Sequence, residues 1–342
     1  MKKEKMAYLE MLRVIALFCV LINHTVNGEL FWQELGGKKW FILLVEFLFC
    51  RINVPLFLMI SGVLLLGRVD TYEKCLRRAF RILVDIVIFS LLYYIWQCHG
   101  TGMEVSMAEF RARVLREEIT TPLWYLYMYL GILILLPLLQ RMAARMEKRD
   151  YQYLIVLAIV VCGSLPVAGH YIGWLRLNPN FSEMLLPVYI GIFFCGYYLA
   201  NYVEIKTKYA VVSGAVLIGS VGFQVYLTWL EAQHEAWYLY VAETNNFPNI
   251  LSAAAVFYIA RWLQTVIKAE WFWKLMMVLG SAMFGAYLLS DFVVTKSRVL
   301  FDAMNGRLNI VIALFVWDVA IFAIAAALTF LLKCIPGVKK LV

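Results

Sequence analysis

An arginine and a histidine on one apolar segment are the two residues of this chain whose types and spacing suit chemistry. Arg13 and His24 stand eleven positions apart in the apolar run near 7–26. At about 100° per residue, this spacing places both side chains within roughly 20° on one helix face and about 16 Å apart along the axis. Arginine is suited to binding anions and histidine to transferring protons near neutral pH. One helix face therefore carries both groups at two depths.

Both residues also have a structural interpretation. Ionisable side chains inside a membrane mark candidate functional sites, but an arginine near a helix end also reaches the lipid headgroups. The other ionisable residues in apolar runs are Glu10, Glu46, Arg51, Asp85, Asp291 and Asp318. Glu46 and Arg51, five residues apart, do not share a helix face, so we expect each to contact other helices. Asp85 follows Arg81 by four positions, a spacing that favours an ion pair.

Composition defines the elements that must position these residues. Hydrophobic residues make up 63% and charged residues 16% of the 342 residues, against roughly half and a quarter in soluble domains. The formal net charge of +8 is spread over short loops, which disfavours a nucleic-acid partner. The seven cysteines and the widely spaced His99, His170 and His234 show no metal-ligand spacing, so we expect no metal site. The composition predicts an all-α, polytopic transmembrane helical bundle in contact with membrane lipid.

About ten segments are long and apolar enough to be membrane helices, since a bilayer core needs about 20 residues per helix. They lie near 7–26, 40–66, 79–98, 122–140, 151–168, 183–203, 208–230, 247–267, 272–293 and 307–333. No connecting loop leaves room for a separate soluble domain, so residues 1–342 are predicted to form one membrane domain. An even number of spans places both termini on the same side.

The distribution of basic residues assigns that side. Of the 31 Lys and Arg residues, 20 fall in the segments that share a side with the N-terminus, nine fall on the other side, and two lie within helices. Lys and Arg are concentrated in cytoplasmic loops of membrane proteins. We therefore predict that both termini are cytoplasmic, with Arg13 near the cytoplasmic end of its helix and His24 towards the outer end.

Further motifs follow Arg13 and His24 in a fixed order. Residues 54–62 read VPLFLMISG, Arg77, Arg78 and Arg81 follow, residues 122–126 read PLWYL, and residues 280–289 read GSAMFGAYLL. This series, with ten residues between Arg13 and His24, resembles the bacterial acyltransferase-3 family of membrane proteins over nearly the whole chain. One position departs from the family pattern, because Ser290 stands where a second His is usual.

The resemblance implies a bacterial enzyme of the cytoplasmic membrane that transfers an acyl group, commonly acetyl from acetyl-CoA, to a hydroxyl of a carbohydrate or another cell-envelope acceptor. From charge, depth and this resemblance together, we expect catalytic roles for His24 and Arg13 and binding of the acyl-CoA phosphates by Arg77, Arg81 and Arg13. His24 acts either as a general base or as a transient acyl carrier. Further candidate substrate contacts are Glu46, Asn53, Trp124 and Asp291.

Two other classes of function use the same residues. A transporter or flippase for a lipid-linked sugar or small amphiphile would employ the intramembrane charges as substrate contacts. A receptor or scaffold would need Arg13 and His24 only for structure. Neither class accounts for the order of the motifs, whereas the acyltransferase does. The chain also lacks the Gly-x-Ser-x-Gly and Gly-rich phosphate-binding patterns of hydrolases and nucleotide-driven pumps.

Overall fold

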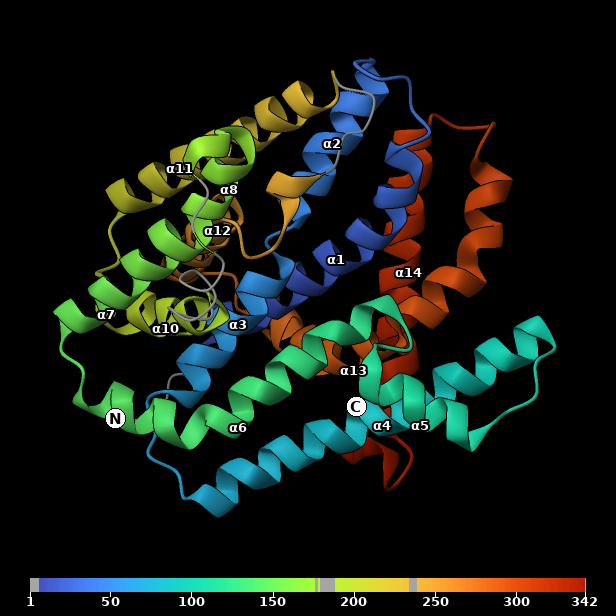
Figure 1. The fold of residues 1–342 in the computed structure, drawn as a ribbon, viewed down its shortest axis with the longest axis horizontal. Helices are drawn as coiled ribbons and strands as arrows, with labels where there is room; N and C mark the ends of the chain where they lie inside the picture. The colour runs from blue at the N-terminus through green and yellow to red at the C-terminus, as the bar shows by residue number, and fades with distance from the viewer. Residues whose placement is uncertain (1–5, 176–177, 179–187, 234–238, 342) are drawn as a thin grey trace.

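The computed structural model of the chain describes residues 6–175, 178, 188–233 and 239–341, and every element among them is a helix (Figure 1). The α-helices are α1 (Ala7–Leu30), α2 (Lys38–Cys50), α3 (Asn53–Leu65), α4 (Tyr72–Thr101), α5 (Met107–Arg116), α6 (Trp124–Arg145), α7 (Lys148–Val156), α8 (Leu165–Tyr171), α10 (Val188–Asn201), α11 (Thr207–Glu231), α12 (Phe247–Val266), α13 (Glu270–Met304) and α14 (Ile310–Lys333). A π-helical segment, Leu157–Ser164, joins α7 to α8. The predicted all-α class is confirmed.

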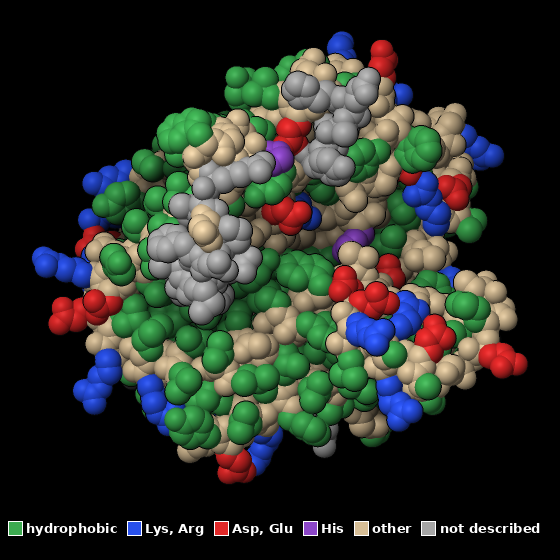
Figure 2. All heavy atoms as spheres, in the orientation of Figure 1, with side chains coloured by type: hydrophobic (Ala, Val, Ile, Leu, Met, Phe, Trp, Pro, Cys, Tyr) green, Lys and Arg blue, Asp and Glu red, His purple; other side chains and the backbone are tan. Residues whose placement is uncertain are grey.

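Eight helical segments of the described chain are long and apolar enough to cross a membrane. They are α1, α2 with α3, α4, the segment Thr121–Arg145, the segment Lys148–Tyr171, α11, α13 and α14. The two other predicted segments correspond to α10 and α12, and residues 183–187 of the former lie outside the described residues. Apolar side chains cover much of the face seen in Figure 2, and most Lys and Arg side chains lie around its rim. A polytopic membrane bundle explains this surface, while the total of ten spans stays a prediction.

Two helices continue beyond the predicted apolar segments, because apolarity does not mark where a helix ends. α4 begins at Tyr72 rather than 79, since the Thr71 hydroxyl caps it by accepting from the Lys74 amide at 3.4 Å. α13 continues from 293 to Met304, and in this extension Arg298 pairs with Asp302 one turn later at 3.1 Å. Polar residues with helix-stabilising contacts thus extend both helices beyond their apolar parts.

α1 lies within the bundle and packs against α2, α3, α12, α13 and α14 (Figure 1). Its start lies close to α13, where Gly280 faces Glu10 so closely that a Cβ at Gly280 would be 2.7 Å from the Glu10 Cβ. The Lys333 ammonium at the end of α14 donates to the neighbouring Ser281 carbonyl. The start of α1 and the end of α14 therefore both lie beside the same part of α13, at Gly280 and Ser281.

The predicted helix 40–66 is interrupted between α2 and α3. Pro55 has no N–H with which to bond the carbonyl of Arg51, four residues earlier, and the last turn of α2 tightens so that the Arg51 amide bonds to the Leu48 carbonyl at 3.3 Å. The Asn53 side chain then accepts from the Val54 amide at 2.6 Å and starts α3. The interruption leaves Arg51 and Ile52 between the two half-helices and puts Asn53 at the start of α3.

α3 and α10 approach one another through two glycines. A Cβ at Gly62 would lie 1.8 Å from the Phe193 carbonyl oxygen, and a Cβ at Gly196 would lie 2.2 Å from the Met59 carbonyl oxygen. Small residues permit such backbone contact, and close packing drives helix association in lipid. The Ser-Gly end of the VPLFLMISG segment therefore has a packing role.

Replacing Gly62 with Ala should lower the thermal stability of the detergent-solubilised protein, because the new methyl group overlaps backbone that cannot turn aside. Overpacking of this kind costs about 1–3 kcal/mol. Thermal unfolding measured by the loss of monodisperse protein in size-exclusion chromatography tests this. The control is Gly131→Ala on α6, where a Cβ meets no atom within 4 Å. Equal melting temperatures for the two variants would contradict the packing role.

Candidate functional site

Arg13 lines a cavity at the end of the bundle where α1 begins. This Arg13 cavity has a volume of about 540 Å³, and three guanidinium groups contribute to its wall, those of Arg13, Arg78 and Arg81. Its remaining wall is mainly apolar and aromatic, from α3, α4, α6 and α13. A volume of this size lies in the range of small-molecule sites, about 300–1,000 Å³. Three fixed positive charges suit it to an anionic ligand.

His24 lines a second, smaller cavity of about 160 Å³ on the same helix. Its polar wall comprises Asn23, His24, Asn27, Arg51, Asn53, Thr121 and Thr244, and Trp124 adds an aromatic face. The His24 ring makes no hydrogen bond within the described part of the chain, so its nitrogens are available to a bound molecule. This His24 cavity combines a proton-transfer group with donors and acceptors for a polar ligand.

α1 is continuous from Ala7 to Leu30, so Arg13 and His24 lie at different depths along one helix, as the sequence predicts. Arg13 lines one cavity and His24 lines the other. Glu10 holds Arg13 in place, because one Arg13 nitrogen donates to both Glu10 carboxylate oxygens, at 2.6 and 2.7 Å. The pair spans three residues of the same helix, leaving the other N–H groups of Arg13 for a ligand.

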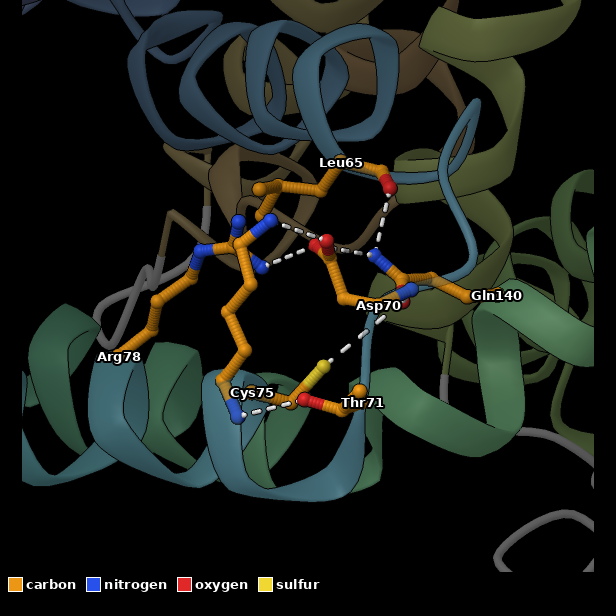
Figure 3. Close-up of polar contacts among 7 residues, drawn as sticks. Leu65, Asp70, Thr71, Cys75, Arg78 and Gln140 are labelled. Carbon is orange, nitrogen blue, oxygen red and sulfur yellow. Dashed lines mark hydrogen bonds and ion pairs between the residues drawn. The ribbon is translucent and has the colours of Figure 1, made fainter.

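Arg78 is held in the wall of the Arg13 cavity by a loop between α3 and α4 (Figure 3). Asp70 accepts from Arg78 and from Lys74, each at 2.6 Å. Gln140 on α6 ties the loop in place by donating to the Leu65 carbonyl at 2.8 Å and accepting from the Asp70 amide at 3.0 Å. The hydrogen bonds from Lys74 and Arg78 hold the pKa of the Asp70 carboxyl well below its ordinary value. Asp70 therefore stays charged and orients Arg78.

Arg51 is a functional candidate for which sequence reasoning favoured a structural contact with another helix. The interruption between α2 and α3 turns its side chain into the wall of the His24 cavity. Its Nε donates to the Ala242 carbonyl and one Nη donates to Asn23 at 3.5 Å. No carboxylate forms an ion pair with it among the described residues, although the charge of Glu243 is near enough to act on it, so a half-buried positive charge faces the cavity. Pro55, four residues later, was the available sequence signal.

The other predicted site residues lie in several different places. Asn53 and Trp124 line the His24 cavity. Asp291 accepts from the Thr120 hydroxyl, and its charge is near enough to act on His24. Glu46 lines a separate, apolar groove formed with α11 and α14. Arg77 lies on the exposed face of α4 and pairs with Glu73 at 2.6 Å, outside the wall of the Arg13 cavity.

The structure also shows what Asp85 and Ser290 contact near the two cavities. The predicted Arg81–Asp85 pair is absent: both Asp85 oxygens are buried without a hydrogen-bond partner among the described residues, because the Arg81 side chain turns to the Arg13 cavity. Ser290, at the position where a His was expected, is buried and donates to the Tyr287 carbonyl at 2.7 Å. No group of three metal-ligating side chains was found among the described residues.

Comparison with known protein families matches residues 6–334 to a family model described as an acyltransferase domain. This match covers nearly the whole chain, including the helices that line both cavities. No curated protein and no solved structure matches the chain.

Replacing Asp70 with Asn should reduce the thermal stability of the protein at neutral pH, because two charge-assisted hydrogen bonds, each worth about 1.5–3 kcal/mol, are weakened. A depressed folded-state pKa stabilises the fold above the ordinary carboxyl pKa of about 3.9, and this contribution declines as the pH falls below it. The difference in melting temperature between wild type and Asp70→Asn should therefore shrink on acidification. The control is Glu73→Gln, which removes an exposed pair, and a pH-independent difference for Asp70→Asn would contradict the ionic role.

Proposed function

We propose, on the premise that this chain belongs to the acyltransferase-3 family, that it transfers a short acyl group from acyl-CoA to a hydroxyl of a carbohydrate or other cell-envelope acceptor. The chain is a membrane acyltransferase by family and by its apolar helices; the donor, the acceptor and the bacterial cytoplasmic membrane as its location belong to the proposal. The observation that carries it is the pair of cavities on α1, one lined by three arginines and one by a histidine that has no hydrogen-bond partner among the described residues.

The Arg13 cavity is the proposed donor site. Acyl-CoA carries phosphates, and guanidinium groups bind phosphate oxygens through paired N–H donors while remaining charged at any relevant pH. Arg13 and Arg78 are held in place by Glu10 and Asp70, and Arg81 adds a third charge. Arg78 replaces Arg77 in this proposal because Arg77 points away from the cavity. By the distribution of basic residues, this end faces the cytoplasm, where acyl-CoA is made.

The His24 cavity is the proposed site of transfer. In the base-catalysed route, a nitrogen of His24 takes the proton of the acceptor hydroxyl, and the hydroxyl oxygen attacks the thioester carbonyl carbon. The new C–O bond forms, the C–S bond breaks, and the CoA sulfur leaves with the proton returned by His24, giving an ester and free CoA. In the alternative route, a nitrogen of His24 attacks the thioester carbonyl carbon, the C–S bond breaks and CoA leaves. The acceptor hydroxyl oxygen then attacks the acyl carbon, the bond to the His24 nitrogen breaks, and the same ester and free CoA result. Both routes use the unpartnered ring.

Arg51 suits the charge that develops in this step. Attack on the thioester places negative charge on the carbonyl oxygen, and preorganised donors in a water-poor site stabilise such charge most effectively. Arg51 is already fixed by Ala242 and Asn23, so little reorganisation is needed when the charge appears. Asn27, Asn53, Thr121 and Thr244 offer hydrogen bonds to a hydroxyl-rich acceptor.

His24→Ala should lower acyl transfer about 10²–10⁴-fold, the range attributed to a positioned acid–base group. The measurement uses radiolabelled acetyl-CoA and membranes with matched amounts of protein, and it follows both label on lipid, glycan or protein and release of free CoA. The control His99→Ala removes an exposed histidine at the end of α4. Unchanged transfer in His24→Ala would remove the residue from the reaction, and movement of a solute without CoA release would favour transport.

Arg78→Gln should raise the KM for acyl-CoA by about tenfold or more with a smaller effect on kcat, because it removes a charge-assisted contact from the donor site. Arg77→Gln is a matched control, since the residue is adjacent in sequence but exposed and paired with Glu73. Initial rates of CoA release over a range of acetyl-CoA concentrations distinguish the two variants. A larger KM effect for Arg77→Gln would reassign the donor site to the other face of α4.

A further inference from the structure

Three aromatic rings stand between the Arg13 cavity and the His24 cavity. Phe57 from α3, Tyr125 from α6 and Tyr287 from α13 line both cavities. Their ring centroids form a triangle with sides of 5.8 Å (Phe57–Tyr125), 6.0 Å (Tyr125–Tyr287) and 6.3 Å (Phe57–Tyr287). Aromatic pairs are in contact at centroid separations of about 4.5–7 Å. The rings thus fill the space between the two cavities.

We propose that these rings form a partition that the thioester must pass, and that Phe57 is the movable ring that sets the largest acyl group transferred. The inference rests on the proposed function, because only an acyl donor held by the arginines and a reaction at His24 require passage between the cavities. It adds a specificity-determining residue to that function.

The three rings are held differently. The Tyr287 hydroxyl donates to the Pro122 carbonyl, and the Tyr125 ring stacks on Tyr129 at 5.7 Å with an interplanar angle of 9°. Phe57 has no polar atom to anchor it and is the least buried of the three. A ring held by packing alone can change rotamer without breaking a hydrogen bond. Phe57 is therefore the ring that turns aside.

The position of Phe57 on α3 fits this role. Asn53 lines the His24 cavity, Phe57 lines both, and Ser61 lines the Arg13 cavity. Residues four apart lie on one helix face, so this face of α3 runs along the same route as the Arg13–His24 face of α1. The Gly62 contact with α10 fixes the backbone next to this face. Movement at Phe57 is thereby confined to its side chain.

The volumes of the two cavities limit the size of the acyl group that can enter the His24 cavity from the Arg13 cavity. The Arg13 cavity, at about 540 Å³, accommodates part of a large donor, whereas the His24 cavity, at about 160 Å³, is much smaller. An apolar cavity of about 150 Å³ holds one benzene molecule. The acyl group and the acceptor hydroxyl must share a space of this size beside His24. The partition and the small cavity together restrict the enzyme to short acyl chains, and removing the Phe57 ring enlarges the space for a longer one.

The test compares donors of increasing length, acetyl-, propionyl-, butyryl- and hexanoyl-CoA, with wild type, Phe57→Ala and Phe57→Trp membranes at matched protein levels. Release of free CoA is measured with each donor, since it also records transfer to water. Phe57→Ala should raise the butyryl-to-acetyl ratio of kcat/KM by about tenfold or more. The reason is that a single methylene group in an apolar pocket changes the kcat/KM ratio between two substrates by about 10–200-fold. Phe57→Trp should lower the propionyl-to-acetyl ratio.

The control is Phe322→Ala on α14, a half-buried phenylalanine that packs on Phe18 at 5.7 Å and lines neither cavity. Its chain-length ratios should match wild type. If wild type releases CoA from acetyl-CoA and the ratios in both Phe57 variants stay within about twofold of wild type, the partition is refuted and the proposed function stands. If wild type releases CoA from none of the donors, the proposed function fails and this inference fails with it. A ratio is unaffected by partial loss of folded protein, which separates specificity from stability.

Discussion

The unbroken backbone hydrogen bonding of α1 sets the distances along the candidate site. In a bilayer no water replaces a lost backbone hydrogen bond, so a membrane-spanning segment stays helical unless a side chain or a neighbouring element compensates. α1 runs without interruption from Ala7 to Leu30, and the helical rise therefore holds Arg13 and His24 about 16 Å apart. The two cavities lie at those depths, and the other helices pack around this fixed separation.

Close contacts between helix backbones then bring the other helices that line the two cavities towards α1. Gly280 lets α13 reach α1 beside Glu10, and Gly62 and Gly196 let α3 and α10 meet at their carbonyl groups. Lipid provides no hydrophobic drive between helices, so such contacts hold the bundle by packing. The aromatic rings of α3, α6 and α13 are in mutual contact between the cavities. Gly280 on α13 and Gly62 on α3 thus hold two of the three helices that carry these rings.

The charged groups of the site are held in two different ways. Carboxylates orient the arginines of the larger cavity, through Glu10 on Arg13 and Asp70 on Arg78. An arginine has five N–H donors, so each keeps some for a phosphate. In the smaller cavity, Arg51 is oriented by the neutral oxygens of Ala242 and Asn23 and by the Phe47 ring, and no carboxylate forms an ion pair with it among the described residues. This contrast suits anion binding in one cavity and stabilisation of transient charge in the other.

Sequence alone determined the membrane-helix class and the shared face of Arg13 and His24, because composition and the helical period act locally. The order of the motifs along the chain indicated the family. Tertiary structure decided what lies opposite that face. The choice of Arg78 over Arg77, the turn of Arg51 into the His24 cavity and the contact of Phe57 with Tyr125 and Tyr287 each depend on helices far apart in the chain. Adjacent arginines on an exposed helix look alike in sequence. Only the packing of α4 against its neighbours makes one of them face the cavity and the other face away.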